Sequence, residues 1–144
     1  MKALYGLVLG LMSLSVSAAI SITDATIRVL PPMVPNTSAY FTLTNNDTIE
    51  RTIVSAISSA APQVEIHEHV MLDDMMRMQQ VEKVVIAPGE TVTFAPGGLH
   101  LMLFGLNKPL INDDKVSVTL QMKNGEQLEF TAIAQAPNAH HQHH

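Results

Sequence analysis

The chain has 144 residues, a formal net charge of −5, a pI near 5.7 and no cysteine. This length suits one domain, and the lack of thiols excludes disulfides, thiolate metal centres and thiol redox chemistry from this sequence. The acidic balance, without any Lys/Arg cluster, argues against nucleic-acid binding, and the low aromatic content of 4% argues against surfaces that stack bases or sugars.

The N-terminal segment has the organisation of a secretory signal. Met1-Lys2 gives a positive start, residues 3–14 are almost wholly apolar, and Val16-Ser17-Ala18 supplies the small residues that a signal peptidase requires. We predict a signal peptide over residues 1–18, cleaved after Ala18 or the next residue, in preference to a buried strand or an inner-membrane anchor. The apolar run is too short for a permanent membrane span, and no cysteine follows it to carry a lipid. The mature chain is therefore expected in a bacterial periplasm.

From residue 20 onward, short apolar runs alternate with turn residues, which is typical of a β-sandwich or barrel. The clearest element is a hairpin in which two alternating segments flank the turn residues Asn124-Gly125. Its strands and the others are predicted at residues 26–30, 39–44, 52–57, 63–67, 82–86, 91–94, 99–104, 115–122 and 128–132. No long period of 3.6 residues occurs, so helices should be scarce, and the prolines at 31–35 should form an ordered loop. One all-β domain is expected over residues 19–135.

One predicted strand carries both histidine and methionine on a single face. Side chains alternate along a strand, so Leu99, Leu101 and Leu103 share one face, and His100 and Met102 share the other. The leucines are the natural core face. His100 and Met102 should then lie side by side on the outer face, about 6 to 7 Å apart along the strand.

The strand at residues 63–67 follows the same pattern. Val64 and Ile66 are expected to face inward, and Glu65 and His67 outward. Two strands should therefore place an imidazole on the solvent side. A lone exposed histidine is usually only a solvated side chain, so neither residue by itself establishes a metal site.

Two of the nine methionines fall in the predicted signal peptide, and the others cluster in the mature chain. Taken alone, Met75, Met76 and Met78 are interpreted as fillers of gaps in the core, because methionine is long and flexible. Met33 and Met71 are interpreted as packing or loop residues.

The spacing of four residues changes the interpretation of Met78. Ten residues separate His67 from Met78, twenty-one separate Met78 from His100, and one separates His100 from Met102. This spacing resembles that of the periplasmic copper chaperone family called PCu(A)C. The resemblance extends over residues 25–134 and is carried by further segments. Residues 38–45 resemble the family's early strand, residues 76–78 its central Met strand, and residues 96–103 its final metal strand with the preceding turn. Residues 105–106 and 108–110 continue the match.

The resemblance implies a cupredoxin-like Greek-key β-sandwich or barrel that holds Cu(I) in an exposed site. By position, the ligands would be His67, Met78, His100 and Met102, with His69 as a possible competitor for the first position. The family's implied work is copper delivery for the Cu(A) centre of cytochrome c oxidase subunit II, often beside Sco-type thiol proteins. A monomer without a permanent membrane anchor and without enzymatic activity is expected.

These residue types suit copper outside the cytoplasm. Thioether sulfur is soft, uncharged and prefers Cu(I), and it is not lost to disulfide formation. Methionine does not titrate, so only the imidazoles should make binding depend on pH. We expect Cu(I) affinity to weaken below about pH 6.5, as His67 and His100 take up protons.

The C-terminal tail, residues 136–144, is a second candidate metal site. Its imidazoles suit Cu(II), and also Zn(II) and Ni(II). Gln142 interrupts the run, which favours a native tail over an expression tag. The tail should be disordered and would capture Cu(II) through His140, His141, His143 and His144.

Three alternatives to a chaperone compete on this sequence. A periplasmic copper-buffering or tolerance protein would carry the same site without a dedicated acceptor. An enzyme is disfavoured, because no Ser/His/Asp arrangement, phosphate loop or dinucleotide fingerprint appears and neither predicted cleavage leaves an N-terminal histidine. A purely adhesive or structural sandwich is the remaining interpretation.

Overall fold

The computed structural model describes residues 6, 10 and 19–137. These residues contain no helix, and hence none long and apolar enough to cross a membrane. The strands are β1 (Ile20–Arg28), β2 (Thr37–Asn45), β3 (Arg51–Ser58), β4 (Gln63–Leu72), β5 (Met75–Gln80), β6 (Val84–Ile86), β7 (Thr91–Phe94), β8 (His100–Phe104), β9 (Lys115–Met122) and β10 (Gln127–Gln135).

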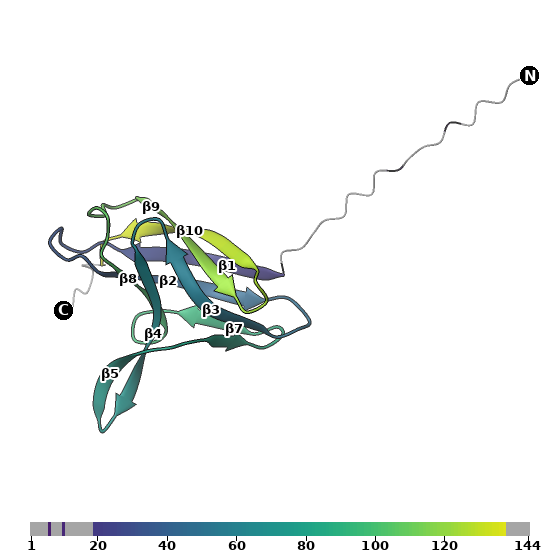
Figure 1. The fold of residues 1–144 in the computed structure, drawn as a ribbon, viewed down its shortest axis with the longest axis horizontal. Helices are drawn as coiled ribbons and strands as arrows, with labels where there is room; N and C mark the ends of the chain where they lie inside the picture. The colour runs from purple at the N-terminus through teal and green to yellow at the C-terminus, as the bar shows by residue number, and fades with distance from the viewer. Residues whose placement is uncertain (1–5, 7–9, 11–18, 138–144) are drawn as a thin grey trace, which may run out of the picture.

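The strands form one mixed sheet in the order β5-β4-β8-β2-β1-β10-β9-β3-β6, with β7 also paired to β2. Most neighbours are not consecutive in the chain, as Greek-key crossovers require. β1 and β10 are parallel, and the other pairs are antiparallel. Figure 1 shows the strands gathered into one body from which the hairpin of β4 and β5 projects. The all-β prediction is confirmed.

The core lies between the inner faces of the curled sheet. Phe41 of β2 stacks on Phe94 of β7 with ring centroids 4.3 Å apart, and it lies 4.9 Å from Phe130 of β10. Leu101 and Leu103 of β8 are fully buried in the same cluster. Burying large apolar side chains supplies the main stabilisation of such a fold. It also fixes which face of β8 turns away from the core.

Two differences from the predicted strands have local causes. β1 begins at Ile20 rather than residue 26, because an irregularity between Thr23 and Thr26, with Asp24 at φ 54°, breaks the alternation of its side chains. The pattern of apolar and polar residues did not predict β5, and only the family resemblance implied a strand at residues 76–78. All of its side chains are exposed, so it has no apolar and polar alternation to find.

β4 is longer than predicted and continues to Leu72. Asp73 and Asp74 alone link it to β5, with φ values of 52° and 61°. Positive φ at both central residues is the type I′ geometry, whose twist matches that of a two-stranded hairpin. This turn sets the register of the β4–β5 pair.

Several predictions fall on parts of the chain that the structure leaves out. His140, His141, His143 and His144 lie outside the described residues, as does all of the predicted signal peptide except residues 6 and 10.

Candidate metal centre

The predicted histidines and methionines come from three adjacent strands. β4 lies between β5 and β8, and His67 of β4 is the direct cross-strand partner of His100 of β8. The two ring centroids are 6.0 Å apart. Met102 is two residues along β8 and pairs with Glu65. Direct partners project to the same side of a sheet. The side chains of these two pairs, His67 with His100 and Glu65 with Met102, therefore share one face.

That face is the one turned away from the core. Leu101 and Leu103, which alternate with His100 and Met102, are fully buried in the apolar cluster, and Ile66 next to His67 is buried as well. Strand alternation therefore places the histidines opposite the leucines, as the sequence pattern predicts.

His100 has one ring nitrogen engaged and one free. Its Nδ1 lies 2.9 Å from the carbonyl oxygen of Gly98, and its Nε2 is buried without a hydrogen-bond partner. A carbonyl can only accept, so Nδ1 carries the proton in the neutral ring and Nε2 is left with a lone pair. A buried nitrogen without a hydrogen-bond partner lowers the stability of the fold, unless a ligand such as a metal ion accepts its lone pair. The ring is thus oriented as a metal ligand would be.

In His67 too, one ring nitrogen is hydrogen-bonded and the other has no partner, but here the bonded nitrogen is Nε2. Its Nε2 lies 2.7 Å from Oε2 of Glu65, and its Nδ1 is buried without a partner. Gln63 donates to the other oxygen of Glu65 and steadies the carboxylate. A carboxylate behind the distal nitrogen fixes the tautomer and raises the basicity of the free nitrogen.

Met102 is held by a hydroxyl group. Ser38 of β2, its cross-strand partner, donates a hydrogen bond of 3.1 Å from Oγ to Sδ. This contact orients the thioether on the face that carries His100. Sulfur keeps a second lone pair for another partner.

His69 of β4 and Met78 of β5 lie on the same face, which therefore extends onto β5. They are direct partners across β4 and β5, whereas the partner of His67 is Gln80. Met78 is therefore diagonal to His67, a separation of about 7 to 8 Å that a long side chain can bridge. The His69 ring lies 5.1 Å from that of His100, closer than the His67 ring.

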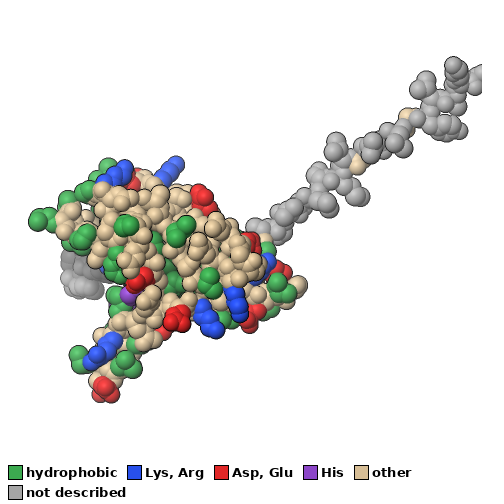
Figure 2. Space-filling model, viewed as in Figure 1, with side chains coloured by type: hydrophobic (Ala, Val, Ile, Leu, Met, Phe, Trp, Pro, Cys, Tyr) green, Lys and Arg blue, Asp and Glu red, His purple; other side chains and the backbone are tan. Residues whose placement is uncertain are grey.

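The expected exposure of the site is wrong for one residue. His100 is only 2% exposed, and both His67 and Met102 are partly covered, whereas Met78 is 48% exposed. His100 lies on the outer face, but the rings of His67 and His69 cover it. Figure 2 shows histidine atoms where the hairpin meets the body.

The gap-filler interpretation is wrong for Met75, Met76 and Met78, and Met71, interpreted as a packing or loop residue, is not packed in the core. Met71, Met75, Met76 and Met78 are all exposed, because the hairpin projects beyond the core. Met33 is exposed in the proline-rich loop, as expected for a loop residue.

Burial and hydrogen bonding shift two pKa values at the site. Burial lowers the pKa of His100 from its usual 6.5, an effect that the hydrogen bond to Gly98 only partly opposes. The hydrogen bond from His67 lowers the pKa of the Glu65 carboxyl, helped by the one from Gln63. Near neutral pH, the site therefore presents an uncharged His100 beside a charged Glu65.

Conventional metal-binding clusters are absent from residues 6, 10 and 19–137. No three His, Cys, Asp or Glu side chains there are grouped so that they could hold one ion, despite the proximity of His67, His69 and His100. The donors that adjoin these imidazoles on the same face are the thioethers of Met78 and Met102 and the carboxylate of Glu65, which is bound to His67 Nε2.

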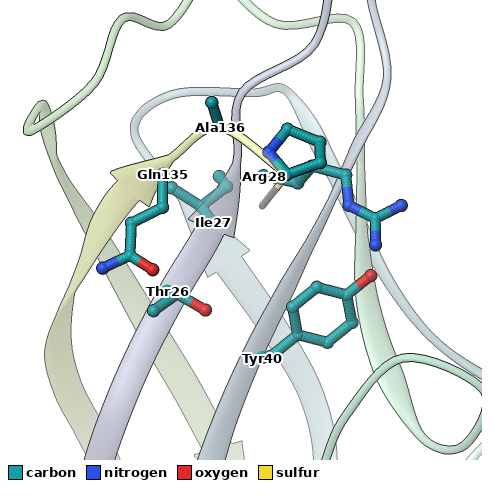
Figure 3. A pocket seen from close by; sticks show the side chains of 7 residues that line it. Thr26, Ile27, Arg28, Tyr40, Gln135 and Ala136 are labelled. Atoms are coloured by element: carbon teal, nitrogen blue, oxygen red, sulfur yellow. The ribbon is translucent and has the colours of Figure 1, made fainter. Parts of the chain in front are cut away.

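A small cavity lies on the neighbouring strands, where the described chain ends. It has a volume of about 140 Å³, and Figure 3 shows Arg28 and Tyr40 at one side and Gln135 and Ala136 at the other. The Arg28 guanidinium carbon lies 5.7 Å from the centroid of the Tyr40 ring. Tyr40 is two residues from Ser38, so it shares the face that carries Met102.

Comparison with known proteins agrees with this fold. The family described as "Putative lipoprotein LpqE-like" matches residues 20–134. A protein of Leifsonia xyli subsp. xyli described as "Putative lipoprotein Lxx21020" is 38% identical over 90 residues, which cover 62% of this chain and 54% of that protein. The chain thus spans about half the length of this curated relative.

Solved structures with the same fold include PCuAC domains. The apo PCuAC domain of PmoF2 superposes with a TM-score of 0.68 at 21% identity, covering 84% of this chain and 93% of that domain. Apo-DR1885 from Deinococcus radiodurans gives 0.66 at 27% identity, covering 86% and 83%, and its Cu(I) form gives 0.58 at 28% identity, covering 85% and 83%.

The family match covers most of the chain, and the PCuAC structures share its strand arrangement. The resemblance noted from the sequence is therefore confirmed at the level of family and fold. This chain belongs to the LpqE-like family and has the PCuAC fold.

Proposed function

We propose that this protein binds Cu(I) through His67, Met78, His100 and Met102. The observation that carries the proposal is the pair of buried ring nitrogens, Nδ1 of His67 and Nε2 of His100, that lack any partner while their opposite nitrogens are held. Two neutral imidazoles and two thioethers form a soft, uncharged donor set, which favours a monovalent copper ion. The Cu(I) form of DR1885, similar in fold at 28% identity, supports copper as the ion.

The proposed role is that of a chaperone in the cell envelope. Copper would be handed to the Cu(A) domain of cytochrome c oxidase subunit II, directly or with a Sco-type protein, and the site itself would catalyse no reaction. The family description, which names a lipoprotein, supports export, and we place the protein in the periplasm as a monomer. The partly exposed Met78 suits transfer, since an acceptor ligand can enter before the other donors release the ion.

The tail histidines His140, His141, His143 and His144 are proposed to capture Cu(II). The last described residues, Ala136 and Pro137, line the cavity beside Arg28 and Tyr40. The described chain thus ends beside Arg28 of β1 and Tyr40 of β2, and β2 is the neighbour of β8.

X-ray absorption tests the ligand set. With one equivalent of Cu(I), the protein should show two sulfur and two nitrogen donors, and Met102→Leu should lose one sulfur. A copper shell without sulfur would contradict the proposal. Transfer of copper to a purified apo Cu(A) domain tests delivery, and a protein that binds copper but transfers none would instead be a buffering or tolerance protein.

A further inference from the structure

A second group of soft donors lies on the projecting hairpin. The turn at Asp73 and Asp74 sets a register in which Met71 of β4 pairs directly with Met76 of β5. The next pair on the same face is His69 with Met78. Direct partners on one face have Cβ atoms about 4.5 to 5.5 Å apart. Three thioethers and one imidazole thus form two adjacent cross-strand pairs.

These methionines do not serve the core. Met71 is 63% exposed and Met76 is 59% exposed, and the buried cluster includes neither. Their face continues the one that carries His67, but Met71 lies four residues farther along β4, at about 13 Å. A single ion cannot contact donors that far apart, so Met71 and Met76 cannot be additional ligands of the His67/His100 centre.

We infer that Met71 and Met76 form a second Cu(I) site on the hairpin, with His69 and Met78 at the boundary between it and the first centre. The inference rests on copper being the cargo proposed above, but Met71 and Met76 belong to the hairpin site alone. Thioether and imidazole donors on neighbouring strands can converge on one soft ion, and Cu(I) is the biological ion that prefers them. The carboxylates of Asp73 and Asp74 at the adjacent turn add negative charge beside the cation.

The hairpin site gives copper a route into and out of the buried centre. His100 is almost fully covered, whereas the hairpin donors are open to a partner. Met78 adjoins both groups, so a Cu(I) ion can exchange ligands there without becoming free. We expect the hairpin to be the place where copper enters and leaves the protein.

Methionine-methyl NMR of the full chain tests the inference. The protein is labelled with [methyl-¹³C]methionine and titrated with Cu(I) without oxygen. The first equivalent should shift Met78 and Met102, and the second should shift Met71 and Met76. Met33, exposed in the loop between β1 and β2, and the buried Met122 belong to neither donor group and should not move, so their signals are the internal controls.

Variants give a second readout. Met71→Leu combined with Met76→Leu should lose one equivalent of bound Cu(I), measured by competition with a chromophoric chelator. Both side chains are exposed, so the fold should be kept, and the far-UV spectrum checks this. Met75→Leu is the matched control, because Met75 lies on the same strand and is also 59% exposed, but it faces the other side and pairs with Leu72. It should bind as much copper as the unmodified chain.

The outcomes separate this inference from the proposed function. If Met102 shifts but Met71 and Met76 do not, or if they shift only together with Met33, the hairpin site is wrong and the first centre stands. If Met71 and Met76 shift while Met102 stays still, the hairpin site stands and the four-ligand centre is wrong. If no methionine methyl responds, both are wrong. Equal losses in the Met75→Leu control would also overturn the hairpin site.

Discussion

The two central histidines are prepared for a cation by the groups behind them. Gly98 holds one nitrogen of His100, and Glu65 holds one nitrogen of His67, so each ring presents the other nitrogen to the space between the strands. The two rings leave different nitrogens without a partner, Nε2 in His100 and Nδ1 in His67. Neither choice can be read from the sequence, because both depend on which acceptor lies nearby.

The Glu65 carboxylate offers a direct test of this preparation. Glu65→Ala removes the acceptor for Nε2–H of His67, and with it the orientation and basicity of Nδ1. We expect Cu(I) affinity to fall by about 10- to 100-fold, the usual cost of losing such a support. Chelator competition at pH 7 measures it. Glu68→Ala is the control, since Glu68 lies on the opposite face of β4 and accepts from Gln79. Equal affinity of the two variants would contradict a supporting role for Glu65.

Burial of His100 should make the stability of the metal-free protein depend on pH. Its pKa is lower in the folded state than the usual 6.5, so the unfolded chain binds the proton first as pH falls. The neutral ring therefore contributes its full share of the folding stability above about pH 6.5. That contribution is lost as the pH falls below this value towards the pKa of the folded state. Denaturant unfolding between about pH 7.5 and 5.5 measures this slope. His100→Gln should have a shallower slope, and an unchanged slope would show that His100 is not responsible.

At the scale of the element, β8 divides its two functions between its two faces. Leu101 and Leu103 enter the core, while His100 and Met102 form part of the candidate centre. The strand period of two keeps these roles apart. Stability and metal binding should therefore respond to different substitutions in the same five-residue strand.

A pair of variants separates the two faces. Leu101→Ala leaves a cavity in the core and should destabilise the protein by about 2 to 5 kcal/mol. Met102→Leu keeps the side-chain size and should cost less than about 1.5 kcal/mol, but it should weaken Cu(I) binding. Urea unfolding and chelator competition on both proteins measure the two effects. Strong destabilisation by Met102→Leu would show that Met102 is a core residue.

Periodicity predicted only the first half of β4 and none of β5, so it missed the hairpin that the two strands form. β5 has no apolar face, so its residues lack the periodicity that reveals a strand. One local signal was available. Asp73-Asp74 lies between two methionine-rich segments, and paired aspartates tolerate the positive φ of a tight turn. The strand exists because the turn and the long edge of β4 hold it, not because it buries anything.

At the scale of the whole molecule, the order of strands creates the site. β8 follows β4 by more than twenty residues, yet the crossover inserts it beside β4 and opposite β5. This brings His67 and His100 into direct pairing and places Ser38 of β2 against Met102. No local pattern of residues specifies such neighbours.

The sequence by itself determined the all-β class, the outward face of His100 and Met102, and the four residues whose spacing resembles that of the PCu(A)C family. These follow from turn residues, strand alternation and residue spacing, which are local properties of the chain. The tertiary structure alone decided the burial of His100, the free nitrogen of each ring and the continuation of the donor face through His69 to Met71 and Met76. The physical reason is that burial and cross-strand pairing arise between segments far apart in the chain, so they exist only once the sheet has closed.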